Sequence, residues 1–333
     1  MSKRRQSVTP SRHDRLFKRV FSDPENAAGE LAAVLPPGML ELLDLTTLKQ
    51  ASSEFVSQDL QANPADLFFS AKMKGMPDQE ALICVLLEHY SRLARFWQAR
   101  LLYYLAHGWI KFCSEHPEAR YLPVIIPVVV YNGKWTYAGP LNFSSLFHPR
   151  AVEKYKSVIP DFTPVMEDLG KVSDAALRVR EMEPAAKLGL WFLRHGYAGR
   201  ELYEQLASWR PVLEQLCSNA NGRDVFASLM RYYMDTPKGP GYEQLMSRME
   251  EIVGERGKQV IMTMAEQLKS QGEARGEARG EARALLTMFN ARGWRLSPAQ
   301  KTLIRTCTDL SMLEQWVRKA AVASSLSEVF GRN

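Results

Sequence analysis

Two carboxylates stand at the ends of strongly apolar segments, where a charge is costly to desolvate. Asp66 opens the apolar run that reaches Met73, and Glu88 directly follows the run from Ala81 to Leu87. A carboxylate at the tip of a buried strand needs a partner, and one divalent metal ion can serve two carboxylates. The stretch between the two acids holds two strands and a turn, so the acids can converge on one edge. The spacing alone equally allows each acid to begin an exposed loop.

The two residues after Glu88 complete this candidate site. Side chains alternate between the faces of a strand, so Tyr90 lies on the face of Glu88 and His89 lies on the other. A neutral tyrosine donates one hydrogen bond but brings no positive charge. We interpret the His89 ring as a packed, hydrogen-bonded side chain. The sequence contains no recognisable Ser/His/Asp or Cys/His constellation and no G-x-x-x-x-G-K phosphate loop.

The elements that must position these residues follow from the apolar patterns. Residues 13–60 read mainly as helix, because Phe17, Val20 and Phe21 share one face at a spacing of about 3.6 residues. The two apolar runs that carry the acids form a predicted hairpin around the turn at 75–78.

A second helix is predicted from the N-cap Ser91 to about Ser114. Another buried strand is predicted within 122–131, with its paired part limited to 128–131 because prolines interrupt the earlier residues. The order is therefore helix, strand hairpin, helix, strand, which is an α/β unit.

Five parts are predicted along the chain. They are a basic flexible arm (1–12), the α/β core (13–150), a helical region packed on the core (151–268), a Gly-Glu-Ala-Arg repeat linker (269–284) and a helical tail module (285–333). The tetrad occurs three times in 272–283. Like charges four residues apart repel and glycine weakens a helix, so we expect a fraying helix or linker there.

Charge and composition narrow the function classes. Residues 1–20 carry seven basic residues and one acid, so their net charge equals the +6 of the whole chain. Such an arm attracts polyanions such as DNA, although a solvated tail is the plain alternative. No apolar run is long enough for a membrane helix, the basic start is not followed by a signal-like segment, and the four cysteines lie far apart. We expect a cytoplasmic protein without a membrane partner.

Several motifs together resemble the Rpn-type recombination-promoting nucleases, a YhgA-like, transposase-related family. They are His13-Asp14-x-x-Phe17-Lys18, Glu88-His89-x-Ser91 and Pro127-Val-x-x-Tyr131-x-Gly133. The resemblance implies a PD-(D/E)XK-type, restriction-endonuclease-like core that acts on DNA. It also implies that Asp66, Glu88 and the backbone carbonyl of His89 bind Mg²⁺ or another divalent cation. The roles of His13 and Asp14 are left open.

One position departs from the family pattern. The residue two places after the glutamate is normally lysine or glutamine, and here it is Tyr90. A substitute is expected near the start of the following helix, with Gln98 as the first candidate beside Arg92, Arg95 and Arg100. The expected function is a Mg²⁺-dependent DNA endonuclease that promotes recombination. The alternative is a catalytically weakened DNA-binding or interaction protein that keeps the fold, and a homo-oligomer is left open.

Overall fold

The computed structural model describes residues 11–51, 67–75, 83–218, 222–236, 240–307 and 309–330. For 83–88 and most of 264–275 it describes the backbone alone. The chain divides into two compact units, Met1–Val260 and Ile261–Asn333, and each is described by itself. In the described parts of the chain, no helix has both the length and the apolar character needed to cross a membrane.

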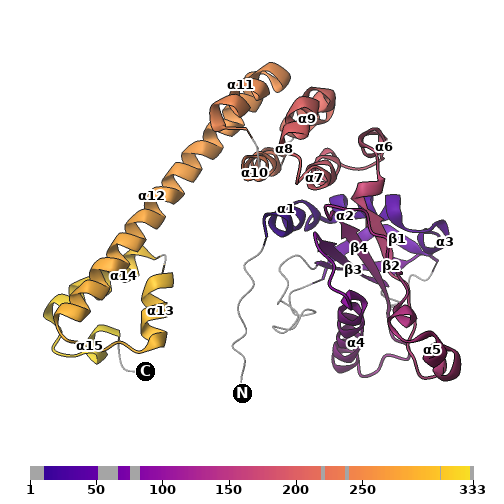
Figure 1. Cartoon of the computed structure of the whole chain (residues 1–333), viewed down its shortest axis with the longest axis horizontal. Coiled ribbons are helices and arrows are strands. Elements are labelled where there is room, and N and C mark those ends of the chain that lie inside the picture. The colour runs from indigo at the N-terminus through magenta and orange to yellow at the C-terminus, as the bar shows by residue number, and fades with distance from the viewer. Residues whose placement is uncertain are drawn as a thin grey trace. The chain divides into compact units, whose positions relative to one another are not determined.

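The described residues form one five-stranded sheet in the first unit, with the strands in chain order (Figure 1). The strands are β1 (Leu43–Gln50), β2 (Leu67–Met73), β3 (Ile83–Tyr90), β4 (Val124–Tyr131) and β5 (Val165–Asp168). The first three are antiparallel neighbours, whereas β4 runs parallel to β3, and β5 runs parallel to β4. A parallel neighbour needs a long crossover, which α4 (Trp97–Glu115) provides between β3 and β4.

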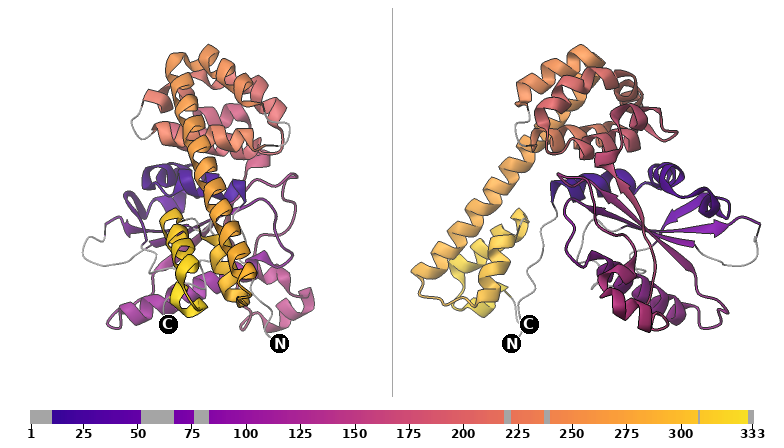
Figure 2. Two further views of the ribbon diagram at one scale, coloured as in Figure 1. Left: turned by 90° about the vertical axis from the view of Figure 1, so that its left-hand side faces the viewer. Right: turned by 45° about the vertical axis from the view of Figure 1, so that its right-hand side comes forward.

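Helices cover both faces of this sheet (Figures 1 and 2). On one face lie α1 (Arg12–Phe21) and α2 (Pro24–Val34), and α4 lies on the other. Phe17, Val20 and Phe21 are fully buried on α1, which confirms their predicted common face. The α4 side has its own apolar cluster, in which Trp97 and Leu101 pack with Val129 of β4.

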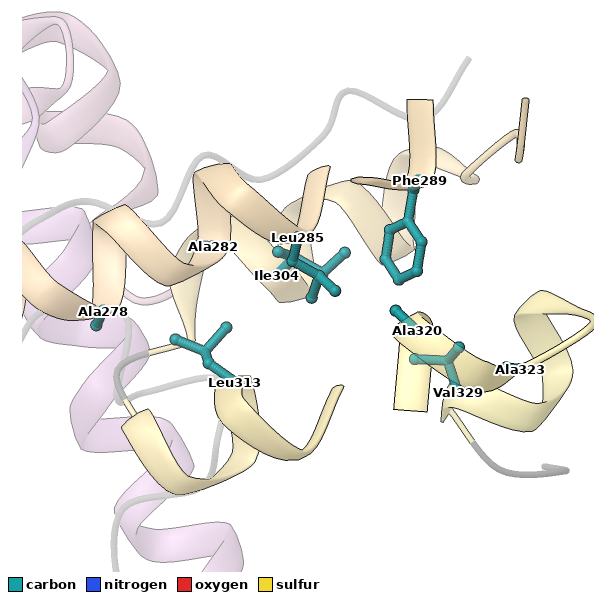
Figure 3. Close-up of a cluster of buried hydrophobic side chains, with 9 residues drawn as sticks. All are labelled: Ala278, Ala282, Leu285, Phe289, Ile304, Leu313, Ala320, Ala323 and Val329. Carbon is teal, nitrogen blue, oxygen red and sulfur yellow. The ribbon is translucent and has the colours of Figure 1, made fainter. Parts of the chain in front are cut away.

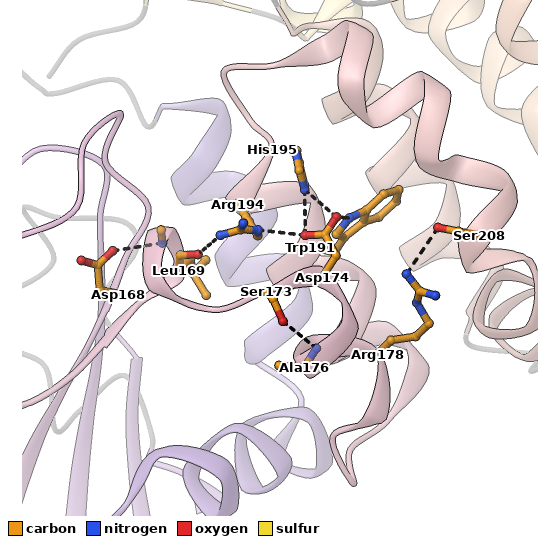
Figure 4. Close-up of polar contacts among 11 residues, drawn as sticks. Asp168, Leu169, Ser173, Asp174, Ala176, Arg178, Trp191, Arg194, His195 and Ser208 are labelled. Carbon is orange, nitrogen blue, oxygen red and sulfur yellow. Dashed lines mark hydrogen bonds and ion pairs between the residues drawn. The ribbon is translucent and has the colours of Figure 1, made fainter.

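The remaining helices of the first unit include α7 and α10, which pack against α1. They are α3 (Pro37–Leu40), α5 (Pro149–Tyr155), α6 (Asp174–Val179), α7 (Pro184–Arg194), α8 (Gly199–Gln205), α9 (Arg210–Ser218), α10 (Gly222–Met234) and α11 (Tyr242–Val253). Asp174 joins α6 to α7 by accepting hydrogen bonds from Trp191, Arg194 and His195 at 2.8–3.0 Å (Figure 4). Burial raises the pKa of Asp174, but the hydrogen bonds, first that of His195, outweigh it and leave the pKa lowered.

A buried charge cluster fixes α2 to β5. Arg180 lies 3.3 Å from Glu30 and 2.6 Å from Glu167, and Glu30 is fully buried. Burial, together with the neighbouring Glu167 charge, raises the pKa of Glu30 to about 8, against the opposing effect of Arg180. Glu30 therefore gives up its charge readily in this cluster.

The sheet differs from the prediction at both ends. Residues 43–50, predicted to be helical, form β1, and β5 lies inside 151–268, which was predicted as a helical region. The sheet thus continues past residue 150, the predicted end of the core. The prediction was also wrong about α4, which begins at Trp97 and not after Ser91.

Pro127 lies within β4, which pairs with β3 along its whole length from Val124. The prediction that only 128–131 is paired was therefore wrong for this neighbour. It is correct for the other neighbour, since β5 pairs with Val128–Tyr131. Asn132 N donates to the Tyr90 carbonyl, so even-numbered residues of β4 point their backbone groups at β3. Pro127 is odd-numbered, so its nitrogen, which carries no hydrogen, faces the side of β5. Because β5 pairs only with Val128–Tyr131, no ladder hydrogen bond is lost at Pro127.

The second unit is a small helical module built on the end of α12 (Glu255–Ala291). Its other helices are α13 (Pro298–Thr306), α14 (Leu310–Val322) and α15 (Leu326–Phe330). The repeat at 272–283 is part of α12, so of the two predicted alternatives the structure shows the helix and not the linker. Ala278 and Ala282 are buried and continue into Leu285 and Phe289, a stripe that packs on α13 and α14 (Figure 3). The four-residue period keeps the alanines on one face, which explains why the repeat is helical.

Candidate active site

A pocket of about 300 Å³ lies where β3 ends. Its lining combines the predicted site with α1 and the start of α4, and it consists of Asp14, His89, Tyr90, Ser91, Arg92, Ala94, Phe96, Trp97 and Arg100. Asp14 of the motif that had no assigned role therefore reaches the carboxyl end of β3. The structure brings α1, β3 and α4 together at one place.

Asp14 is fixed from two sides at the start of α1. It forms a capping box with Ser11, in which the Ser11 N–H donates to Asp14 at 2.9 Å and the Asp14 N–H donates to the Ser11 hydroxyl at 3.1 Å. Its other carboxylate oxygen lies 3.1 Å from Nδ1 of His89. Burial raises the pKa of Asp14, but the hydrogen bonds of His89 and Ser11 outweigh it, so the pKa is lowered. Asp14 is thus ionised beside the His89 ring.

The partners of His89 determine where its protons lie. Asn132 donates from Nδ2 to the Leu193 carbonyl at 3.1 Å, and a carbonyl only accepts, so the amide has one orientation. Its oxygen Oδ1 then faces Nε2 of His89 at 2.9 Å, and Nε2 must carry a proton. Nδ1 faces the Asp14 carboxylate, which also accepts. Both ring nitrogens donate, so the imidazolium form satisfies every partner. The prediction of a packed, hydrogen-bonded His89 ring is confirmed.

His13 is the second histidine of this hydrogen-bonded group. Its Nδ1 lies 2.7 Å from the Tyr232 hydroxyl and 3.3 Å from Nδ2 of Asn132, both of which are donors here. Burial, followed by the positive charges of His89 and Arg12, lowers the pKa of His13 to about 3. Burial also raises the pKa of Tyr232, so the tyrosine keeps its proton and donates it to His13.

The first turn of α1 is anchored to distant loops. Arg12 donates to the carbonyls of Gly196, at 2.6 Å, and Asp235. Its guanidinium also lies 5.4 Å from the centre of the Tyr232 ring. Ser11 and Arg12, which the prediction placed in the flexible arm, therefore belong to the folded structure. These contacts tie the start of α1 to residues that come more than one hundred positions later in the chain.

The predicted carboxylate ligands are only partly covered by the structure. Asp66 lies outside the described residues, and for Glu88 the backbone alone is described. Leu67, directly after Asp66, is the register partner of Leu87, which directly precedes Glu88. Among the side chains that the structure does describe, no three His, Cys, Asp or Glu residues gather as a metal site.

The third predicted ligand, the carbonyl of His89, has a defined direction. Asn132 N donates to the Tyr90 carbonyl at 3.0 Å, so that carbonyl faces β4. Backbone groups of successive residues alternate between the two neighbours of a strand, so the His89 carbonyl faces the side of β2. Two carboxylates and a carbonyl offer only oxygen atoms, the donors that Mg²⁺ prefers, so the chemistry of the predicted set fits this ion.

Tyr90 and Gln98 occupy different surroundings. Tyr90 lines the pocket and packs on Trp97, with ring centres 6.2 Å apart. Gln98 is 1% exposed and donates to the Pro140 carbonyl at 3.0 Å, and it is not part of the pocket lining. Arg100, named beside Gln98 as a substitute, does line the pocket.

Comparison with known proteins identifies the family. Residues 11–223 match the family described as "Putative transposase, YhgA-like". The chain is 30% identical over 282 residues to the recombination-promoting nuclease RpnA of Escherichia coli strain K12, which covers 82% of this chain and 87% of the relative. The chain belongs to this family. The recombination-promoting nuclease RpnD of Escherichia coli O157:H7 is 34% identical over 165 residues, which covers 46% of this chain and 62% of RpnD.

The chain is also similar to a protein that is named as inactive. The inactive recombination-promoting nuclease-like protein RpnE of Escherichia coli strain K12 is 24% identical over 277 residues, which covers 80% of this chain and 84% of RpnE. No solved structure matches the chain. The recognised resemblance is thus confirmed at the level of the YhgA-like family, and the names of the relatives point to a nuclease.

Two members of the hydrogen-bonded group were not predicted. Neither Asn132 nor Tyr232 was among the candidate site residues. The sequence Tyr131-Asn132-Gly133 carried a usable signal, because an amide at the carboxyl end of a buried strand needs partners. Tyr232 had no such signal, and it also lies beyond residue 223, where the match to the YhgA-like family ends.

Proposed function

We propose that this chain is a metal-dependent DNA endonuclease that promotes recombination, with a PD-(D/E)XK-type core and Mg²⁺ as its cofactor. The names of RpnA and RpnD support a recombination-promoting nuclease. The order of elements supports the core, since a helix precedes three antiparallel strands and a crossover helix leads to a parallel fourth strand. We place the activity on DNA in the cytoplasm.

The register of β2 against β3 carries this proposal. Ala51 N donates to the Phe68 carbonyl, so Phe68 faces β1, and Leu67 therefore directs its backbone groups at Leu87 of β3. In an antiparallel pair, the next two residues outward form a non-hydrogen-bonded pair, whose Cα atoms lie only about 4.5 Å apart. Asp66 and Glu88 are the next two residues in the sequence. We propose that the ladder continues by this one step and brings the two carboxylates together.

In the proposed site, Asp66, Glu88 and the His89 carbonyl would hold the metal ion. A bound Mg²⁺ polarises the scissile phosphate and lowers the pKa of a bound water. The other residues hold the strand end in place, because Asp14 and Asn132 fix the His89 ring from both sides. Tyr90 contributes a neutral surface, so the positive charge for the phosphate must come from another residue.

The test is the nicking of supercoiled plasmid by the purified chain, with Mg²⁺ and with EDTA. Cleavage is expected only with Mg²⁺, and Asp66→Asn and Glu88→Gln should each abolish it, because each removes a charged ligand without changing the side-chain size. Asp44→Asn is the matched control. Asp44 of β1 lies opposite Lys72 in the strand register, toward the other end of β2 from Asp66. Cleavage that persists in both ligand variants would refute the proposed site.

The second candidate function is a DNA-binding or interaction protein with weakened catalysis. Tyr90 favours it, since this residue cannot supply the charge of the usual lysine, and the name of RpnE shows that inactive relatives exist. This reading expects metal-independent DNA binding without any nicking. It also expects nicking to appear in Tyr90→Lys, which restores a cation next to the proposed ligands.

A further inference from the structure

Among its described lining residues, the pocket at the end of β3 has two arginines and one acid. Arg92, from the loop after β3, and Arg100, from the first turns of α4, both line it together with Tyr90. Among the described residues of the lining, the acid is Asp14, whose carboxylate already serves the His89 ring. Two arginines therefore line the same space as the tyrosine that replaces the usual lysine.

Arg100 is held in a defined position. Its Nε donates to the Tyr104 hydroxyl at 2.5 Å, and its guanidinium lies 5.2 Å from the centre of the same ring. Tyr104 is only 4% exposed and belongs to the apolar cluster between α4 and the sheet. A buried aromatic side chain thus fixes the arginine one helical turn into α4. A preorganised guanidinium loses little freedom when it binds an oxyanion.

We infer that Arg100, with Arg92 beside it, binds the scissile phosphodiester in this pocket and supplies the positive charge that Tyr90 does not. This inference rests on the proposed function, because it assigns the phosphate subsite of the same reaction. A guanidinium donates two parallel hydrogen bonds to phosphate oxygens, and a preformed cation stabilises the charge that builds up on them. Gln98 cannot take this role in the described structure, because it is buried against Pro140.

The first experiment measures binding of a short DNA duplex in EDTA as a function of salt, so that it does not depend on cleavage. Arg100→Gln and Arg92→Gln should each reduce the slope of log affinity against log salt by about 0.9, the value for one phosphate that is no longer neutralised. Arg210→Gln is the matched control, because Arg210 is an exposed arginine of α9 paired with Glu214. Its slope should equal that of the natural chain.

The second experiment measures plasmid nicking with Mg²⁺. Arg100→Gln should lower the rate by about 10²–10³-fold, as the loss of a preorganised donor does elsewhere. The double variant Tyr90→Lys with Arg100→Gln should recover most of this loss, because the lysine returns a cation to the pocket. Arg100→Lys keeps the charge but not the fork, so it should retain the salt slope and lose part of the rate.

The outcomes separate this inference from the proposed function. An unchanged salt slope and an unchanged rate in Arg100→Gln would overturn the phosphate subsite, while nicking by the natural chain would keep the nuclease. If the slope is reduced in the arginine variants but the natural chain never nicks DNA, the subsite is supported and the nuclease is refuted. A natural chain that does not bind the duplex at all would overturn the subsite. Thermal unfolding of each variant shows whether equal amounts of folded protein are compared.

Discussion

Replacement of Asn132 by aspartate tests the hydrogen-bonded group behind the candidate site. The two side chains have the same shape, but an aspartate carboxylate only accepts hydrogen bonds. In the natural chain Nδ2 donates to the Leu193 carbonyl and to Nδ1 of His13, at 3.1 and 3.3 Å. Asn132→Asp therefore places an oxygen against an oxygen, in a residue that is 2% exposed.

The size of the effect follows from these hydrogen bonds. The new carboxylate oxygen is left without a donor and faces the Leu193 carbonyl, which keeps the hydrogen bond from the Gly196 N–H, and an unsatisfied buried group costs about 1–3 kcal/mol. The hydrogen bond from Nε2 of His89 is kept and gains charge assistance, which offsets part of this cost. We expect the free energy of unfolding at neutral pH to fall by about 1–3 kcal/mol.

Urea unfolding of Asn132→Asp and of the natural chain measures this difference, with Asn142→Asp as the matched control. Asn142 donates to the hydroxyl of Ser144, which can turn and donate in its place, so the control should lose little stability. The loss in Asn132→Asp should shrink at acid pH, because a protonated carboxyl regains a donor for the Leu193 carbonyl. A variant as stable as the natural chain at neutral pH would refute the assigned orientation of Asn132 and the protonation of His89.

Three further predictions concern stability and DNA binding. Gly276→Ala and Gly280→Ala should each stabilise α12 by about 1 kcal/mol, as measured by hydrogen exchange, because an added Cβ meets nothing within 4 Å. Gly293→Ala should destabilise the end of α12 instead, because Gly293 has a φ of +70°. Because the pKa of Glu30 is raised from 4.5 to about 8, the free energy of unfolding should fall as pH rises between these values, and Glu30→Gln should remove that part of the slope in urea titrations. Deletion of residues 1–10 should lower the salt slope of DNA binding by about 0.9 for each phosphate that the arm neutralises, and an unchanged slope would mean that the arm does not touch DNA.

The central strands could be predicted from the sequence, because β2, β3 and β4 are runs of apolar residues bounded by turns. The two edge strands, β1 and β5, could not be predicted in this way. Residues 43–50 mix polar and apolar types, as suits an edge strand, and their leucines also fit a helical spacing. With four residues, β5 is too short for any periodicity to appear. Its position depends on the pairing with β4, which is a tertiary contact.

The repeat at 272–283 shows why local terms alone left a fraying helix and a linker as alternatives. The prediction weighed the repelling glutamates and the costly glycines, both of which are local terms. It did not consider the face formed by Ala278 and Ala282, which small side chains allow to pack closely on α13 and α14. Burial of that face adds a favourable term that helix propensity alone does not contain. The neighbours of this face come later in the chain, so the stripe could be seen in the sequence but not its partner.

The candidate site was predictable as a set of motifs but not as a network. His13, Asp14 and His89 could be named because they belong to recognisable motifs. Their connection could not be predicted, because it runs through Asn132 and Tyr232 and depends on how α10 packs against α1. Sequence periodicity identifies the buried face of each helix but not the helix that it meets.

The long-range hydrogen bonds of His13 also set the time at which the pocket is completed during synthesis. Tyr232 follows His13 by 219 residues, and Leu193 follows Asn132 by 61. At a translation rate of ~5–20 residues per second, the ribosome needs roughly 10–45 s to bridge the longer interval. Once β3 has been made, α1, β2 and β3 are all present, but His13 still lacks its partner on α10 until Tyr232 is made. A chain that stops before residue 232 never acquires this partner, so only a nearly complete first unit supports the end of β3 in full.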